Sequence, residues 1–323
     1  MAVFISRQST SLSQADIQIK MIKKIRIGTR ESQLALWQAN LVKSLLKHQG
    51  IESELVTIKS EGDLDLSTPL YAMGVQGIFT RSLDQALLNN KIDLAVHSMK
   101  DVPVQLPSGI REAAILERDN PYDLLVPHPS KSNFSKGPSI IASSSLRRKA
   151  QWLHRYPTDN IEPIRGNVNT RLKKLAASEW RGAIFAAAGL ERIGLRPSNA
   201  EQLDWMIPAP AQGAILVVCR IQDENIVEAC RPFHHQETAF CVKVERDFLA
   251  GLLGGCSTPI GALAVISGDE IFLRGNLLDS SGIKMISVEK RISLELASSL
   301  GLAAAHELLR NGGDEIVKQK QHA

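Results

Sequence analysis

The chain has little of several features that mark other classes of protein. Its longest apolar runs, such as residues 183–190 and 213–219, fall far short of the roughly 18 residues that a membrane helix needs. Aromatic residues make up 5% of the 323 residues, which leaves little material for stacking on bases. Lysine and arginine total 38 against 34 acidic residues, and the net charge of +4 is too small to indicate nucleic acid binding. The composition therefore predicts a globular protein that binds neither membrane nor nucleic acid.

Cysteine is also scarce, and the four cysteines (Cys219, Cys230, Cys241 and Cys256) show no CxxC spacing. That number is too small for a disulfide scaffold and fits a reducing cytoplasm. The first twenty residues are polar and lack the apolar core of a secretory signal. We expect residues 1–20 to form a disordered extension.

The remaining sequence alternates short β-branched runs with helical patterns, first over residues 25–96 and again over residues 140–188. Such series favour open α/β sheets, so two lobes of similar build are expected. Proline-rich stretches near Pro121 and at residues 208–210 mark the expected crossings between the lobes. Residues 59–77 lack periodicity and predict a mobile loop. A strand at residues 214–218 can belong to either lobe, and an α+β unit follows His235.

Arginines gather where expected strands end and helices begin. Arg30 follows the first strand, Arg147 and Arg148 follow three serines, and Arg165 and Arg171 bracket residues 166–170. Ligands of open α/β sheets bind beyond the carboxyl ends of the strands, where helix N-termini and arginine forks favour anions. A surface charge explains any one of these arginines better, but their repetition predicts a polyanionic ligand. Because no GxxxxGK[ST] loop is present, a small polycarboxylate is preferred over a nucleotide.

The segment HSMKDVP (97–103) directly follows an expected buried strand. Asp101 can act there as an acid or base, or can stabilise a developing cation. An Asx turn at a strand end explains the aspartate equally well. His97 is better explained by packing than by catalysis, and His234 and His235 are poor evidence for zinc, so no metal site is predicted.

Cys256 lies in a glycine loop, after Gly254 and Gly255 and before Pro259. A thiol in such a loop can be an exposed nucleophile or an attachment point. For an isolated cysteine, a loop position without a function is the commoner explanation. The other three cysteines lie in apolar contexts and predict inert packing.

Six motifs together indicate more than any one of them. They are HSMKDVP (97–103), SSLRR (144–148), RGNVNTRL (165–172), PAPAQGA (208–214), HHQETA (234–239) and GGCSTPIG (254–261). In this order, from about Met21 to near the C-terminus, the chain resembles the porphobilinogen deaminases, also called hydroxymethylbilane synthases.

The resemblance implies an α/β fold with two periplasmic-binding-protein-like lobes and a small α+β C-terminal domain. The expected limits are residues 21–117 and 214–231 for domain 1, 122–209 for domain 2 and 236–323 for the cofactor-bearing domain 3. A monomer is expected.

The resemblance also implies a transferase of tetrapyrrole and haem biosynthesis, which condenses four porphobilinogen molecules into hydroxymethylbilane and releases ammonia. It implies a covalent dipyrromethane cofactor, joined by a thioether to Cys256, and Asp101 as the catalytic residue. The residues expected to bind carboxylates of the substrate or cofactor are Arg30, Ser32, Lys100, Ser145, Arg147, Arg148, Arg165, Arg171, Arg192 and Gln212.

These implied roles agree with the chemistry of the residues. Each pyrrole carries an acetate and a propionate, so a growing chain gathers carboxylates and needs many cationic partners. Loss of ammonia requires a proton on the leaving amine and leaves an electron-poor azafulvene, and a carboxylate can serve both steps. The family commonly has lysines in the segment matching residues 69–83, where this chain has Ala72, Gln76 and Arg81. The charge of that segment therefore departs from the family pattern.

Two other classes of function are open to the same residues. A non-catalytic binding protein would clamp a carboxylate ligand between its lobes and would give Cys256 no role. A thiol-dependent acyl transferase would use Cys256 as its nucleophile and would need a histidine partner, which the sequence does not place.

Overall fold

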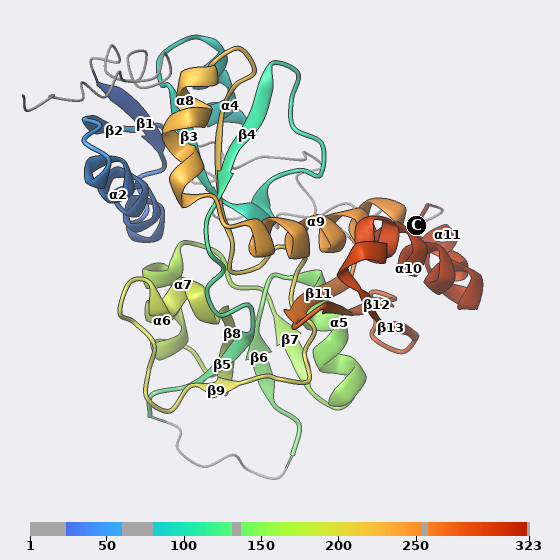
Figure 1. Ribbon diagram of the computed structural model, residues 1–323. Helices are drawn as coiled ribbons and strands as arrows, with labels where there is room; N and C mark the ends of the chain where they lie inside the picture. Colours follow the sequence, from blue (N-terminus) through green and yellow to red (C-terminus); the bar gives the residue numbers. More distant parts are fainter. Residues whose placement is uncertain (1–23, 60–79, 131–136, 253–257, 322–323) are drawn as a thin grey trace, which may run out of the picture.

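The computed structural model describes residues 24–59, 80–130, 137–252 and 258–321. The extension 1–20, nearly all of the loop expected at 59–77, and Cys256 lie outside these residues. Figure 1 shows an upper α/β lobe, a lower α/β lobe and a C-terminal α+β domain beside them. The predicted fold class, two periplasmic-binding-protein-like lobes with a small α+β domain, is confirmed.

Lobe 1 is built on a five-stranded sheet with helices on both faces. Its strands, in spatial order, are β2 (Ser53–Thr57), β1 (Ile25–Thr29), β3 (Leu94–Ser98), β10 (Ile215–Arg220) and β4 (Ile110–Ile115). Its helices are α2 (Gln33–His48), α4 (Arg81–Leu88) and α8 (Glu224–Cys230), with short 3₁₀ turns η2 (Met99–Asp101) and η3 (Arg231–Phe233). Alternate residues of β3 enter different cores: Leu94 and Val96 pack towards α2, whereas Ala95 packs with residues of α4. Both faces are therefore covered, as in other mainly parallel sheets.

Lobe 2 repeats this plan with shorter strands. Its strands, in spatial order, are β7 (Asn160–Glu162), β6 (Ile140–Ala142), β8 (Gly182–Ala186), β5 (Asp123–Pro127) and β9 (Glu201–Gln202). Its helices are α5 (Leu146–Arg155), α6 (Val168–Ala176) and α7 (Ala187–Glu191). In each lobe the first three strands in spatial order run parallel and the last two pair antiparallel. Two lobes of similar build were expected from the repeated pattern. The two sheets have the same arrangement of strands in space, except that the fourth strand comes last along the chain in lobe 1 (β10) and first in lobe 2 (β5).

The chain passes between the sheets twice, once between Ile115 and Asp123 and again between Gln202 and Ile215. These crossings contain the prolines that predicted them. Strand β10, whose lobe the sequence left open, lies between β3 and β4 in lobe 1. Strands β4 and β5, beside the crossing at Pro121, were not expected. The residue limits of the three domains remain a prediction.

The C-terminal domain packs α9 (Gln236–Gly251) and α10 (Leu300–Leu308) on an antiparallel sheet. The sheet contains β11 (Ile260–Ser267), β12 (Glu270–Leu278) and β13 (Met285–Ser293), and the remaining segments are η4 (Leu294–Ser299), a π-helical turn η5 (Leu309–Gly313) and α11 (Asp314–Gln321). Phe248 of α9 is fully buried against Gly275 of β12, where a β-carbon would clash with the ring.

Two charged residues of α9 tie this domain to the rest of the chain, Glu245 to the two crossings and Arg246 to lobe 1. Glu245 is fully buried and accepts hydrogen bonds from the Arg118 guanidinium, at 2.6 and 3.1 Å, and from the Ala211 and Ala264 amides. Arg246 donates to the carbonyl oxygens of residues 102–104, which directly follow Asp101. The helix that leads towards residues 254–261 is therefore fixed to the turn that carries Asp101. Among the described residues, no helix is both long and apolar enough to span a membrane.

Candidate active site

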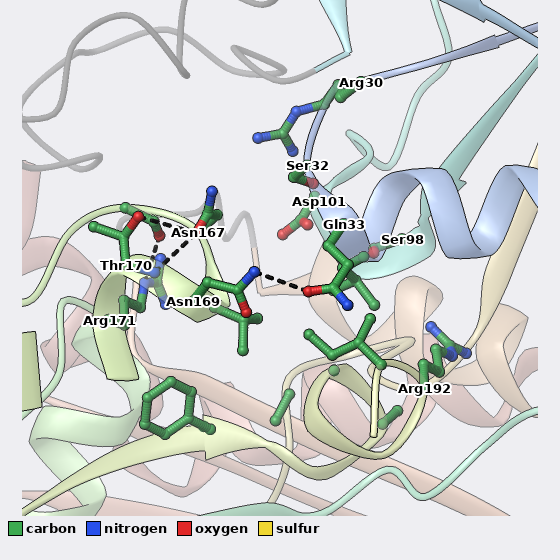
Figure 2. Close-up of a pocket in the computed structure, with 18 of the residues that line it drawn as sticks. Arg30, Ser32, Gln33, Ser98, Asp101, Asn167, Asn169, Thr170, Arg171 and Arg192 are labelled. Carbon is green, nitrogen blue, oxygen red and sulfur yellow. Dashed lines mark hydrogen bonds between the residues drawn. The ribbon is translucent and has the colours of Figure 1, made fainter. Parts of the chain in front are cut away.

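A cavity of about 640 Å³ lies between the two lobes, within the size range of small-molecule sites. Figure 2 shows Arg30, Ser32 and Asp101 on one side of it and Asn167, Thr170 and Arg171 on the other. The charged residues that line it are Arg30, Glu31, Lys59, Lys100, Asp101, Arg148, Arg165, Arg171 and Arg192. Seven are cations and two are carboxylates, so the wall carries a large excess of positive charge.

Two helices begin at this cavity. The hydroxyl of Ser32 caps α2 by accepting from the Ala35 amide at 3.3 Å, and the Asn167 side chain caps α6 by accepting from the Thr170 amide at 2.9 Å. Both capping residues line the cavity, so the positive ends of the two helix dipoles add to the field of the arginines. The site is suited to an anion.

Lobe 1 contributes the carboxylate. Strand β3 ends at Ser98, and the turn η2 that follows places Lys100 and Asp101 in the cavity wall. The Lys100 ammonium donates to Gln212 Oε1 at 3.1 Å, which joins the turn to the second crossing. Burial and then the charge of Arg148 lower the pKa of Lys100 to about 8, although Asp101 and Asp123 oppose the shift.

The paired arginines of SSLRR face in different directions. Arg148 lines the cavity, whereas Arg147 does not. Arg147 donates to Asp123 Oδ2 at 2.8 Å and to the Ile207 carbonyl at 2.8 Å. Arg148 donates to Asp123 Oδ1 from Nε at 3.1 Å and from Nη2 at 2.8 Å. Asp123 is fully buried, and although burial alone raises its pKa, Arg147, Arg148 and Lys100 hold the pKa well below its ordinary value.

Arg165 and Arg171 come from the segment RGNVNTRL. Gly166 between them has a φ of +111°, a conformation that glycine adopts readily, and a β-carbon there would clash with Thr170. This turn lets Arg171 Nε donate to the Gly166 carbonyl at 2.7 Å while the side chain lines the cavity. Burial, followed by the charge of Arg148, lowers the pKa of Arg171 to about 10.

Arg192 follows α7 and is fixed by groups of the two crossings. Its Nε donates to Asp119 at 2.7 Å, its Nη2 donates to the Gly213 carbonyl at 2.6 Å, and its guanidinium lies 5.7 Å from the centre of the Trp37 ring. The side chain lines the cavity and contacts elements of both lobes.

The structure brings together most of the residues that the sequence predicted for the site. Those that line the cavity are Arg30, Ser32, Lys100, Asp101, Arg148, Arg165, Arg171, Arg192 and Gln212. Two others do not line it: Ser145 caps α5, 3.4 Å from the Arg148 amide, and Arg147 lies behind the wall with Asp123. Cys256 is outside the described residues.

Sequence reasoning missed several polar residues of the wall, namely Gln33, Ser98, Asn167, Asn169 and Thr170. Asn169 donates to Gln33 Oε1 at 2.8 Å across the cavity, between α6 and α2 (Figure 2). Asn167 carried a usable signal, because asparagine before a helical pattern is a typical cap. Asp123 was also missed, since it follows a proline-containing stretch that resembles a turn.

The remaining reactive side chains contribute little to this site. Burial, and then the charge of Arg30, lower the pKa of His97 to about 4, so its imidazole is neutral near pH 7. Cys219, Cys230 and Cys241 are buried thiols, and burial raises the pKa of Cys241 to about 11. Within the described ranges, no group of three or more His, Cys, Asp or Glu side chains could hold a metal ion.

Several solved structures of solute-binding proteins are similar to this chain. The methionine-binding protein MetQ matches 67% of this chain and 92% of its own at 15% identity, with a TM-score of 0.43. A periplasmic substrate-binding protein of an ABC transporter from Coxiella burnetii matches 67% and 94% at 14% identity, with a TM-score of 0.40. The L-cystine solute receptor of Neisseria gonorrhoeae matches 68% and 88% at 15% identity, with a TM-score of 0.34. Matches this distant say nothing about ligand or activity.

Sequence-family models give a specific result. The model described as the porphobilinogen deaminase dipyromethane cofactor binding domain matches residues 25–228. The model of the porphobilinogen deaminase C-terminal domain matches residues 239–310. Together they include both lobes, the cavity and most of the C-terminal domain. The chain therefore belongs to the porphobilinogen deaminase family.

Proposed function

We propose that Asp101 is the catalytic carboxylate of this protein, and that the arginines around it bind the carboxylates of substrate and cofactor. As a member of its family, the protein is a transferase that condenses four porphobilinogen molecules into hydroxymethylbilane, with release of ammonia, on a dipyrromethane cofactor. The observation that carries the residue roles is the cavity wall itself, where Asp101 lies among seven cations.

The residues of the cavity fit a dipyrromethane group. Its two pyrroles carry four carboxylates, and the wall offers seven cations against Glu31 and Asp101. Burial and the charge of Arg148 lower the pKa of both Lys100 and Arg171, and a carboxylate bound beside them would favour the charged form of each. The group supplies the nucleophilic pyrrole carbon to which the first substrate is joined. Arg148, Arg165 and Arg171 would hold its carboxylates, and Cys256 would carry the thioether.

Asp101 has two tasks in each addition. It donates a proton, through a hydrogen bond, to the amine that leaves the substrate, and the carboxylate then offsets the positive charge left on the ring. Arg30, Lys100 and Arg171 bind the acetate and propionate groups and so orient the ring relative to Asp101. Arg171 and Lys100 lie near Asp101 in the structure, close enough for its negative charge to raise the pKa of both cations, in opposition to burial.

The first experiment replaces each carboxylate of the wall in turn. Asp101→Asn should fold normally and lose at least a thousandfold in kcat, because the amide neither donates that proton nor carries the charge. Glu31→Gln, an exposed carboxylate on the same wall, should keep kcat within a few-fold. Near-normal turnover of Asp101→Asn would refute the assignment.

A second experiment addresses the attachment site. The intact mass of the denatured protein should exceed the sequence mass by two linked pyrrole units, and the Cys256→Ser variant should lack the excess. An unmodified wild-type protein would first be incubated with porphobilinogen and weighed again. If no adduct formed even then, the alternative of a non-catalytic binding protein would be preferred.

Growth of the chain in one cavity needs room, and movement of the lobes about the two crossings would provide it. Gln33 and Asn169 lie on opposite lobes and are joined by one hydrogen bond. Cysteines at these two positions, linked by a short thiol-reactive reagent, should allow the first additions and block later ones. Mass spectrometry reads the number of added units, and unchanged turnover would contradict lobe movement.

We also propose that the protein acts as a cytoplasmic monomer and binds no nucleic acid. The support for a reducing compartment is the set of three buried thiols, and the modest net charge of +4 speaks against nucleic acid. Light scattering of the loaded protein tests the monomer, because a mass of twice 35.4 kDa would contradict it.

A further inference from the structure

Asp123 has no place in the mechanism above, yet its carboxylate accepts four hydrogen bonds from side chains behind the cavity wall. It is the first residue of β5, it is 0% exposed, and it is not among the residues that line the cavity. Its oxygens accept from the side chains of Arg147, Arg148 and Gln212 at distances between 2.8 and 3.1 Å. Three side chains are thus fixed by one carboxylate that the ligand cannot reach.

Arg148 illustrates what this contact does. Its Nε and Nη2 donate to Asp123 Oδ1, and its Nη1 donates to the Ile184 carbonyl at 2.9 Å. Of the five N–H groups of a guanidinium, one on each terminal nitrogen is left for a ligand. A free arginine side chain populates many rotamers, whereas these bonds hold one orientation of the fork in the cavity wall.

Gln212 extends the same contact into lobe 1. Its Nε2 donates to Asp123 Oδ1 at 2.9 Å and to the Pro121 carbonyl at 2.7 Å, while its Oε1 accepts from Lys100 at 3.1 Å. A continuous series therefore runs from Asp123 through Gln212 to Lys100, the neighbour of Asp101. The two cations that it reaches, Arg148 and Lys100, come from different lobes and both line the cavity.

The sheet itself does not require an acid at this position. Asp123 pairs with Ala186, the last residue of β8, and in lobe 1 the corresponding pair is Ile215 with Ser98, the last residue of β3. An isoleucine thus fills the equivalent place in the lobe that has no such arginine pair behind its wall. Buried ion pairs also seldom stabilise a fold more than apolar residues of similar size would. Stability alone therefore does not account for Asp123.

We propose that Asp123 is a positioning residue for carboxylate binding, which fixes Arg148 directly and Lys100 through Gln212 without touching the substrate or the cofactor. The inference rests on the proposed function of the cavity as the site of the pyrrole carboxylates. In this proposal Asp123, a residue of lobe 2, also sets the position of Lys100, a cavity cation of lobe 1.

The test replaces Asp123 and a matched carboxylate elsewhere. Asp93 accepts from Arg26 and Arg220 at the far end of the lobe 1 sheet, so it too is a carboxylate that holds two arginines, although its side chain is 18% exposed. Asp123→Asn should lower the fraction of protein that carries the dipyrromethane mass and raise KM for porphobilinogen at least tenfold. Calculated per loaded enzyme, kcat should stay within a few-fold. Asp93→Asn should lower stability while loading and KM stay at wild-type values.

The pH dependence of KM gives a readout that a purely structural role would not move. Lys100 faces Arg147 and Arg148 of α5, Asp101 of its own turn, Asp123 of β5 and the neutral Gln212, and its pKa is lowered to about 8. As Lys100 loses its charge, KM should rise above that pH in the wild type. Asp123 raises the pKa of Lys100, so the rise should begin at a lower pH in Asp123→Asn.

A double variant covers the case in which Asp123→Asn does not fold. Asp123→Leu combined with Arg147→Leu removes one buried acid and one buried base together, while Arg148 keeps its bond to the Ile184 carbonyl and its place in the cavity wall. The variant therefore leaves less uncompensated buried charge than the loss of Asp123 alone. This variant should fold and still show the tenfold rise in KM. A folded double variant with wild-type loading and wild-type KM would overturn the proposal. If the wild type itself showed neither adduct nor turnover, the proposed function would fail instead.

Discussion

The two lobes arrange their strands alike in space but place different residues where their sheets meet the cavity. In lobe 1 the last two residues of β3 are His97 and Ser98, and the turn beyond them carries Lys100 and Asp101. In lobe 2 the last two residues of β8 are Phe185 and Ala186, and α7 begins beyond them with two alanines. Equivalent strand ends thus present the proposed catalytic carboxylate in one lobe and an apolar surface in the other.

The arginines show the opposite distribution. Arg148, Arg165, Arg171 and Arg192 all come from lobe 2, whereas Arg30 comes from lobe 1. The shared topology fixes where a ligand can bind, namely at the carboxyl ends of the parallel strands. In the proposed function the residues at those ends divide the work, with lobe 1 supplying the reacting carboxylate and lobe 2 most of the anion binding. The following predictions test this division, starting with the largest effect.

The largest loss of stability is expected when the first residue of β10 in lobe 1 is replaced by the residue type found at the start of β5 in lobe 2. Ile215→Asp places in lobe 1 the residue type that lobe 2 has at Asp123, but Ile215 is 1% exposed in an apolar core. Without a cationic partner, the buried carboxyl must stay protonated, and the change should cost more than about 5 kcal/mol of unfolding free energy. Urea unfolding measures it, and a loss below about 1 kcal/mol would show that the two places are interchangeable.

Replacing either of two arginines of lobe 2 should weaken substrate binding, but the two replacements should lower the free energy of unfolding by different amounts. Arg148→Leu leaves Asp123 with fewer donors and should cost about 3–5 kcal/mol, in addition to weakening the binding of the pyrrole chain. Arg171→Leu removes one hydrogen bond to a backbone carbonyl and should cost no more than about 1.5 kcal/mol. Both variants should raise KM for porphobilinogen. Equal losses of stability, or an unaltered KM and loading, would contradict this account.

His97 of lobe 1 should make the free energy of unfolding depend on pH in the acid range. His97 has a folded-state pKa of about 4 against an ordinary value of 6.5, so the unfolded chain binds more protons between these two values. Stability is fully present above pH 6.5 and falls as the pH falls through about 4, by about 3 kcal/mol from this group. His97→Phe, the residue of lobe 2, should flatten unfolding free energy against pH in that window. A slope equal to that of the wild type would remove His97 as the cause.

Removing the hydrogen bond between Asn169 and Gln33 across the cavity should have the smallest effect. Asn169→Ala removes the hydrogen bond to Gln33 between the lobes, worth about 1 kcal/mol or less. We expect KM to change by less than about fivefold and unfolding free energy to change little. Asn40→Ala is a suitable control, because Asn40 bonds within its own helix α2. If Asn169→Ala and Asn40→Ala had the same KM and the same free energy of unfolding, the hydrogen bond between Asn169 and Gln33 would have no role.

Local patterns predicted most of the lobes. The strand at Ile25, the helix after Ser32 and the helix after Ser145 follow from side-chain periodicity and capping residues, which act within a few positions of the chain. Strand β4 was not predicted because it is defined by its pairing with β10, in which Ile110 lies opposite Arg220. A pairing over such a sequence distance leaves no trace in local periodicity.

The candidate site was predicted by residue type and position, but not by direction. The repetition of strand, arginine and helix located the cavity wall. It could not show that Arg147 faces Asp123 while its neighbour Arg148 faces the cavity, because adjacent helical residues point about 100° apart and the packing decides which one is buried. The attachment role of Cys256 is implied by the family resemblance, not by its glycine loop alone, and remains a prediction.

The two crossings have a consequence for the order in which the chain folds during synthesis. All strands of lobe 2 lie between Asp123 and Gln202, so this lobe can form its sheet without help from the rest of the chain. Lobe 1 emerges from the ribosome first but must wait for β10, which inserts between β3 and β4. Until then β3 and β4 each have an unpaired edge, and such edges invite association with other chains. The lobe that is made second should therefore be the first to complete its fold.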